Sequence, residues 1–186
     1  MKTLRTPLLL AAVLLAVAPL APAAEAGKKP GKAAAAEKPA EGVPPAVADA
    51  MSKLVEAAIQ HAAVDLAKGV DDFLPYGVLQ LKSGELRHVA WTRPNPPPPM
   101  DVLTGIVVTL REQARQNPQV VAAITVAPSA VQTVDGQTVK GMRCEVDHRD
   151  GAPRVVFIPY TRENGKVVTG TMLYLAGPNP VFERAA

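Results

Sequence analysis

Three dipeptides of the hairpin-turn type punctuate the second half of this chain: Asp135-Gly136, Asp150-Gly151 and Asn164-Gly165. They are strong hairpin signals, because Asn, Asp and Gly accept the positive φ angles of tight turns between antiparallel strands. The runs between them are rich in β-branched residues, so the pattern predicts an antiparallel meander. The expected strands cover residues 120–127, 139–147, 154–160 and 166–175, with residues 131–134 either separate or continuing the first.

Two helices are expected before the meander. Apolar residues recur at spacings of three and four from Val47 to Leu66, and Gly69 ends the pattern. The second helix follows the proline-rich residues 93–99 and stops at Asn117-Pro118, since proline suits the first turn of a helix but not its interior. The expected core-facing stripes are Val47, Met51, Leu54, Ala58, Ala62 and Leu66, widened by Val55 and Ile59, and Met100, Leu103, Ile106, Val107, Leu110 and Ala114.

A further hairpin lies between the helices. Residues 73–81 and 85–91 have β-branched and aromatic character, and Lys82-Ser83-Gly84 between them supplies the turn. A two-residue loop of Ser83 and Gly84 would pair Tyr76 with Trp91. A loop longer by one residue would shift every partner, so both registers stay open.

The order of helix, two strands, helix and three or more strands predicts an α+β fold. We expect a single domain over residues 46–186, with a five- to six-stranded antiparallel sheet and two helices packed on one face. Roughly 140 residues suffice for one domain with a real core.

This element order resembles that of profilin-like and roadblock-like domains over residues 46–175. The resemblance implies a sheet in which the second strand and the fourth-to-fifth strands flank the first. Residues 73–77, Phe-Leu-Pro-Tyr-Gly, and residues 147–151, Asp-His-Arg-Asp-Gly, also resemble segments of uncharacterised small secreted bacterial α+β proteins. Neither resemblance implies a reaction, because one fold hosts many functions.

The first 26 residues have the three parts of a secretory signal peptide. Lys2 and Arg5 form a charged start, an apolar run follows over residues 8–18, and small residues end near Ala23 or Ala26. The apolar run is shorter than the roughly 18 residues that span a bilayer. We therefore expect export to the periplasm or beyond the cell, with no transmembrane span after cleavage.

Residues 27–45 are rich in Gly, Pro, Ala and Lys and are expected to form a flexible linker. The leader and this linker account for the positive charge of the chain. Six of the 20 Lys and Arg residues and three of the 17 Asp and Glu residues lie before residue 44, which leaves 14 of each sign in the domain. A neutral domain lacks the basic patch of a nucleic-acid binder, so we expect no nucleic acid as a partner.

Cys144 is the single cysteine, so no disulfide can form within the chain. It has the strand spacing of Met142 and Val146, which puts these three side chains on one face. We expect Cys144 to be a buried small hydrophobe.

The best chemical candidates are Asp147 and His148, and His88 is a third candidate that the fold would have to bring beside them. A carboxylate and imidazole cluster can position a general base, which makes a small hydrolase or metal-dependent enzyme centred on His148 the alternative hypothesis. Asp and Gly also suit a tight turn for conformational reasons alone. His61, on the flank of the first helix, is expected at the surface. The chain has no HExxH, no paired Cys and no phosphate loop, so we expect no metal and no cofactor.

Three aromatic residues offer a different site. Tyr76, Trp91 and Tyr160 either line one ligand groove or cap the core at one end of the sheet. The leading hypothesis is a noncatalytic binding or assembly module of the cell envelope. Its partner would be an unknown protein or a small ligand, and a homodimer is possible.

The signal-peptide interpretation of residues 1–26 predicts that the chain is cleaved and exported. Cells that express the full chain should export a form that begins at Ala24 or Gly27, as intact-mass spectrometry of the exported protein would show. Leu14→Arg, which places a charge within the apolar run, should abolish processing. Recovery of the wild-type chain with its leader intact in the cytoplasm would contradict the signal-peptide interpretation.

Overall fold

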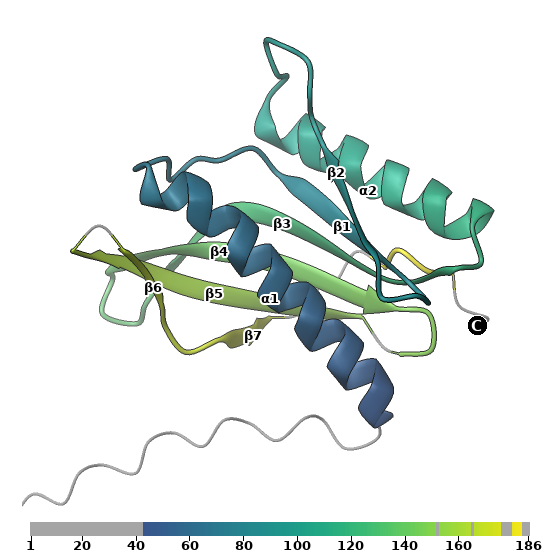
Figure 1. The fold of residues 1–186 in the computed structure, drawn as a ribbon. Coiled ribbons are helices and arrows are strands. Elements are labelled where there is room, and N and C mark those ends of the chain that lie inside the picture. Colours follow the sequence, from purple (N-terminus) through teal and green to yellow (C-terminus); the bar gives the residue numbers. More distant parts are fainter. Residues whose placement is uncertain (1–42, 152, 165, 176–179, 184–186) are drawn as a thin grey trace, which may run out of the picture. The chain divides into compact units, whose positions relative to one another are not determined.

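The computed structural model describes residues 43–151, 153–164, 166–175 and 180–183 (Figure 1). Residues 1–42, which include the expected leader and nearly all of the expected linker, lie outside the described residues. The elements in chain order are α1 (Pro45–Ala67), β1 (Tyr76–Leu81), β2 (Leu86–Ala90), α2 (Pro99–Gln116), β3 (Val120–Gln132), β4 (Thr138–His148), β5 (Arg154–Glu163), β6 (Lys166–Thr169) and β7 (Leu173–Leu175).

The strands form one antiparallel sheet in the order β2-β1-β3-β4-β5-β6, and the short β7 pairs with β5. The expected α+β class, with two helices and an antiparallel sheet, is confirmed. Of the two alternatives for residues 131–134, continuation of the first strand is the one observed, because β3 runs without a break through Val131 and Gln132. The profilin-like resemblance implied a different neighbour for β1, since β3 flanks it here in place of a fourth or fifth strand.

The first hairpin adopts the longer of the two expected loops. The Leu81 amide donates to the Glu85 carbonyl oxygen over 2.9 Å, which leaves three residues in the loop. Gly84, the last of them, has φ of 86°, as expected for a type I turn followed by a left-handed residue. Tyr76 therefore pairs with Ala90, so its expected pairing with Trp91 is wrong by one residue.

The two helices contact opposite faces of the central strands, which corrects the expectation that both pack on one face. The Tyr76 hydroxyl donates to the Ala58 carbonyl oxygen of α1 over 2.6 Å. A Cβ atom on the next residue, Gly77, would lie 2.9 Å from side-chain atoms of Ile106 and Leu110 in α2. Adjacent residues in a strand point to opposite faces. Because β1 is buried on both faces, each face needs its own covering layer.

The α1 side holds the larger apolar cluster. It joins the α1 stripe to residues of β1, β3, β4 and β5, among them Met142, Cys144 and Val146, so the expected burial of Cys144 is confirmed. Burial raises the pKa of the Cys144 thiol to about 12. The α2 side holds a second cluster, to which Val181 and Phe182 contribute from the C-terminal segment, residues 180–183.

The stripe of α2 begins at Val102, not at the expected Met100. Val102, Ile106, Leu110 and Ala114 are buried at steps of four, whereas Met100 is 69% exposed. At about 100° per residue, the two steps of three from Met100 to Ile106 rotate the stripe by about 120°. Met100 therefore points away from the core.

The expected last strand, residues 166–175, is divided into β6 and β7. Tyr160 pairs with Thr169 and Phe157 pairs with Leu173, so the register changes by one residue between them. Pro159 lies between these pairs, and its carbonyl oxygen accepts the Gly170 amide over 2.8 Å. Proline in a strand marks a bulge or an edge. The β4–β5 pairing also ends at Gly141 and Pro159, so this proline lies where β5 leaves its ladder with β4.

Substitution of two glycines by alanine tests this packing, because the two variants should change the free energy of unfolding in opposite directions. A Cβ atom on Gly141 would lie 2.3 Å from the Phe157 ring and 2.7 Å from the Ile158 carbonyl oxygen. Gly141→Ala should therefore lower the free energy of unfolding by about 1–3 kcal/mol. Gly105→Ala, on the open face of α2, should raise it by about 0.5–1 kcal/mol, because nothing lies within 4 Å of the added atom. Urea unfolding measures both, and equal effects would contradict the described packing.

Candidate functional site

Asp147 and His148, the expected catalytic pair, point to opposite faces of β4. The Asp147 carboxylate is buried on the α2 side, where Oδ2 accepts the amides of Val181 and Phe182 over 2.8 and 3.0 Å. This carboxylate thus holds the C-terminal segment against the sheet. Carboxylates that accept backbone amides in a buried setting serve structure through strong charge-assisted hydrogen bonds.

His148 lies on the α1 side and is also buried. Its Nδ1 accepts the Asp150 amide over 3.0 Å, which shapes the turn after β4. Burial lowers the pKa of His148, an effect that Asp150 and Asp147 partly oppose. The His148 imidazole thus stabilises the tight turn that Asp150 and Gly151 form, as expected if this segment serves conformation and not catalysis.

His88 lies far from His148. It pairs with Val78 on β1, which pairs with Ile124 on β3, and that residue pairs with Val146 on β4. Three strand spacings of about 4.8 Å separate His88 from β4, which gives roughly 14 Å. The structure therefore does not bring the three candidate catalytic residues together, and the described residues contain no cluster of three side chains that could hold a metal ion.

His88 instead lies beside His61 of α1. Their ring centroids are 4.9 Å apart, and the His61 ring also lies 4.5 Å from that of Tyr76. Both imidazoles are exposed, as expected for His61. Desolvation and the neighbouring His61 lower the pKa of His88.

The three aromatic residues do not share one groove. Tyr76 and Tyr160 both belong to the apolar cluster beneath α1, but they come from β1 and β5, which are three strands apart. Trp91 follows the end of β2 and is 36% exposed. The two tyrosines are thus placed as core residues with hydrogen-bonded hydroxyls.

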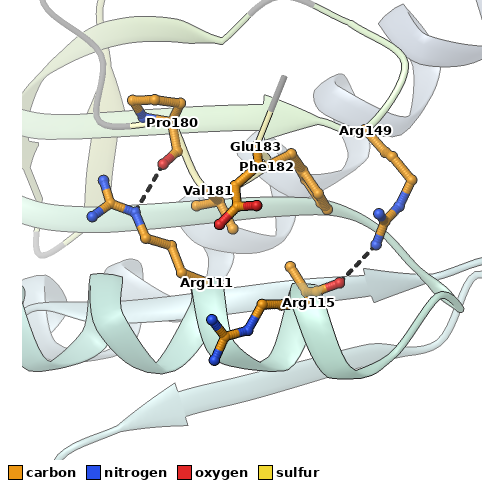
Figure 2. Close-up of a pocket in the computed structure, with 8 residues that line it drawn as sticks. Arg111, Arg115, Arg149, Pro180, Val181, Phe182 and Glu183 are labelled. Carbon is orange, nitrogen blue, oxygen red and sulfur yellow. Dashed lines mark hydrogen bonds between the residues drawn. The ribbon is translucent and has the colours of Figure 1, made fainter. Parts of the chain in front are cut away.

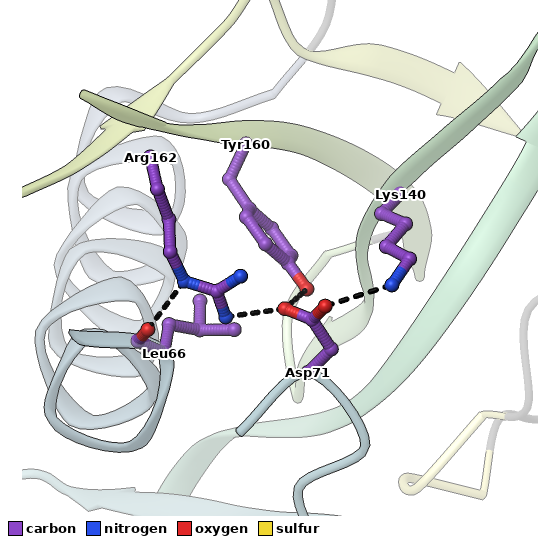
Figure 3. A network of polar contacts seen from close by, with 5 residues as sticks. All are labelled: Leu66, Asp71, Lys140, Tyr160 and Arg162. Carbon is purple, nitrogen blue, oxygen red and sulfur yellow. Dashed lines mark hydrogen bonds and ion pairs between the residues drawn. The ribbon is translucent and has the colours of Figure 1, made fainter. Parts of the chain in front are cut away.

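Tyr160 takes part in a polar network around Asp71 (Figure 3). Asp71 accepts the Tyr160 hydroxyl over 3.1 Å and Lys140 Nζ over 2.7 Å, and it also forms an ion pair with Arg162. Arg162 Nε donates to the Leu66 carbonyl oxygen at the end of α1 over 2.6 Å. The network therefore ties the end of α1 and the following loop to β4 and β5.

The same network shifts two pKa values. Hydrogen bonds from Arg162 and Lys140 hold the pKa of the Asp71 carboxyl far below its usual range. Burial, followed by the hydrogen bond to Asp71, raises the pKa of Tyr160 to about 12. Sequence reasoning missed this network because its members lie far apart along the chain, with no local pattern to connect Asp71 with Arg162.

A cavity of about 720 Å³ lies between α2 and the C-terminal segment (Figure 2). Arg111, Arg115 and Arg149 line it, but each has a structural partner. Arg149 donates to the carbonyl oxygens of Ala114 and Val120 over 2.8 and 3.0 Å and lies over the Phe182 ring. Arg111 Nε donates to the Pro180 carbonyl oxygen over 3.0 Å, and Arg115 pairs with Glu112. Arg149 therefore caps α2, and Arg111 and Arg149 hold the C-terminal segment in place, whereas Arg115 forms an exposed ion pair within the helix.

A second cavity, of about 560 Å³, runs along the flank of α1 and is called the α1 groove below. Its wall is formed by α1 with Val43 just before it, by the α1 side of β4 and β5, and by β7 with the segment that leads into it. Its apolar lining consists of Val43, Ala48, Met51, Val55, Ile59, Val146, Val156, Met172 and Tyr174. Its polar lining consists of Ser52, Glu56, Gln60 and Arg154.

The α1 groove has one faint signal in the sequence. Val55 and Ile59 make the apolar stripe of α1 wider than the part of the helix that packs on the sheet, and Ile59 is only half-buried. The far wall depends on Met172 and Tyr174, which the register change after Gly170 places there. Tyr174 is 53% exposed, so the groove opens to solvent on that side. The lining suits an apolar molecule of small-ligand size.

Comparison with known proteins found no family model, no curated protein and no solved structure that this chain matches. Among the described residues, neither helix combines the length and apolarity that a membrane crossing requires.

The contacts of Asp71 predict that its contribution to the free energy of unfolding depends on pH. Asp71→Asn should lower the free energy of unfolding at pH 7 by about 1 kcal/mol, because it removes the charge that pairs with Arg162 and Lys140. The depressed pKa of Asp71 means that its contribution is present above the unfolded pKa of about 3.9 and is lost as pH falls toward the folded value.

The gap in stability between wild type and Asp71→Asn should therefore narrow in acid, as urea unfolding at several pH values would show. Asp49→Asn, which removes an exposed pair with Lys53, is the matched control and should have a much smaller effect. Equal losses for both variants, or a gap independent of pH, would contradict the role of the network.

Proposed function

We propose that this domain is an exported, noncatalytic module that binds a small apolar ligand in the α1 groove. The observation that carries the proposal is the groove itself, a concave surface on which side chains of α1, β4, β5 and the β7 segment present apolar atoms to solvent. Its volume of about 560 Å³ lies within the usual range for ligand sites, which is roughly 300–1,000 Å³. Export rests on the leader pattern of residues 1–26.

Binding without catalysis is supported by the chemistry of the lining. Among the described residues that line the groove there is neither imidazole nor thiol, and Ser52 is the single aliphatic residue with a hydroxyl group. A nucleophilic serine needs an adjacent base that is itself oriented by a third group. The residues that drew attention as catalytic candidates lie elsewhere, with Asp147 committed to backbone amides and His148 to its own turn.

Assembly with a second copy is the other candidate. The outer strands β6 and β7 expose Val168, Leu173 and Tyr174, and β6 lies at the edge of the sheet. An exposed edge with apolar side chains is a template for pairing with another chain. The homodimer expected from the sequence therefore stays a prediction, with this edge as its most suitable surface.

The uncharged fluorescent probe N-phenyl-1-naphthylamine tests the α1 groove. It should bind the wild-type protein with enhanced fluorescence, and Met172→Asp should weaken binding by about tenfold, because the carboxylate must lose water when the probe enters. Met100→Asp is the matched control, since Met100 is exposed on α2 away from the groove, and it should bind as wild type does.

Absence of probe binding to the wild-type protein, or equal weakening by both substitutions, would overturn the groove as the binding site. Urea unfolding of each variant checks that the fold is retained.

A further inference from the structure

We infer that the ligand of the α1 groove is an elongated apolar molecule with one acidic headgroup, of the fatty-acid type, and that Arg154 binds this headgroup. The inference rests on the proposed function, because it names the ligand class of the same groove. Its basis is the position of one guanidinium group and the surrounding distribution of charge.

Arg154 is the first residue of β5 and pairs with Val146. It has the same parity as Val156, so its side chain lies on the α1 side of the sheet, and all three residues line the groove. Arg154 is half-buried. The positive charge of its side chain is therefore presented beside an apolar surface.

Arg154 is half-buried and has no partner, whereas Arg93, the other arginine of the described domain without a partner, is exposed. Within the described part of the chain, no hydrogen bond, ion pair or ring contact engages its guanidinium group. Partners are present for Arg87, Arg111, Arg115, Arg143, Arg149 and Arg162. Arginine side chains that are removed from solvent usually have a hydrogen-bonding or ion-pair partner. The planar guanidinium group can bind a carboxylate through two parallel hydrogen bonds. An acidic ligand would supply the missing counter-charge.

The rest of the lining limits the ligand to one acidic group. Glu56 of α1 is the only other charged residue of the described lining, and it does not pair with Arg154. A second negative charge would be repelled by this carboxylate, whereas an uncharged chain would not.

The shape of the groove favours a long ligand. The lining residues of α1 extend from Ala48 to Gln60, which corresponds to about 18 Å along the helix axis. Gly151, three residues before Arg154, contacts Val47 at the start of α1, where a Cβ atom on the glycine would lie 2.7 Å from the valine. Arg154 therefore lies toward the start of α1, and the apolar chain would extend along the helix toward Ile59.

The experiment compares dodecanoate with dodecanol as competitors for bound N-phenyl-1-naphthylamine. The protein is purified from cells that express the full chain with its own leader. Wild type should bind dodecanoate at least about tenfold more tightly than dodecanol, as expected for a desolvated charge-assisted pair. Arg154→Gln should reduce this preference to within about twofold and leave dodecanol binding unchanged, whereas Arg154→Lys should retain part of it.

Arg93→Gln is the matched control, because Arg93 is an exposed arginine outside the groove lining. It should keep the full preference for dodecanoate. Binding of the uncharged probe reports in the same cuvette whether Arg154→Gln has kept its fold.

The outcomes separate the two proposals. Equal affinity of wild type for dodecanoate and dodecanol overturns the acidic headgroup and leaves the apolar groove in place. A preference for dodecanoate that persists in Arg154→Gln overturns the role of Arg154. Failure of the probe and of both competitors to bind the wild-type protein overturns the proposed function itself.

Discussion

Burial of β1 on both faces is the constraint on which the rest of this domain depends. Its even-numbered residues meet α1, and its odd-numbered residues meet α2, with Gly77 allowing that helix to approach closely. A sheet with an apolar strand of this kind needs two covering layers. On one side the layer is α2 with the C-terminal segment, and on the other it is α1, whose flank forms the wall of a groove over β4 and β5.

Much of the fold follows from local sequence signals. The glycine-containing turns predict the hairpins, and the periodic apolar residues predict both helices, because these signals arise from backbone sterics and from the burial of one face. The first hairpin shows where local signals stop. A single extra loop residue decides whether Tyr76 faces Ala90 or Trp91, and the sequence accommodates either.

The faces of the sheet and the candidate site depend on interactions that no local pattern records. Strands apolar at successive positions, such as β1, do not indicate which face a given helix covers. Asp71 meets partners from β4 and β5 that only the folded topology brings near. The residue types of the motif around Asp147 and His148 suggested catalysis. In the structure, Asp147 instead accepts a backbone amide of the C-terminal segment, and His148 accepts one from its own turn. The groove required Met172 and Arg154 to be placed beside α1 by the register of the outer strands.

Cys144 has a consequence for the life of the protein after synthesis. The proposed export would bring the protein into an oxidising compartment, where accessible thiolates are converted into mixed disulfides or sulfenic acids and a lone cysteine has no partner within its own chain. The Cys144 thiol lies in the core between α1 and the sheet and is protonated at any physiological pH. It is therefore inert toward such chemistry while the domain stays folded, and it becomes reactive only when the sheet opens. Its modification would mark unfolded copies and spare native ones.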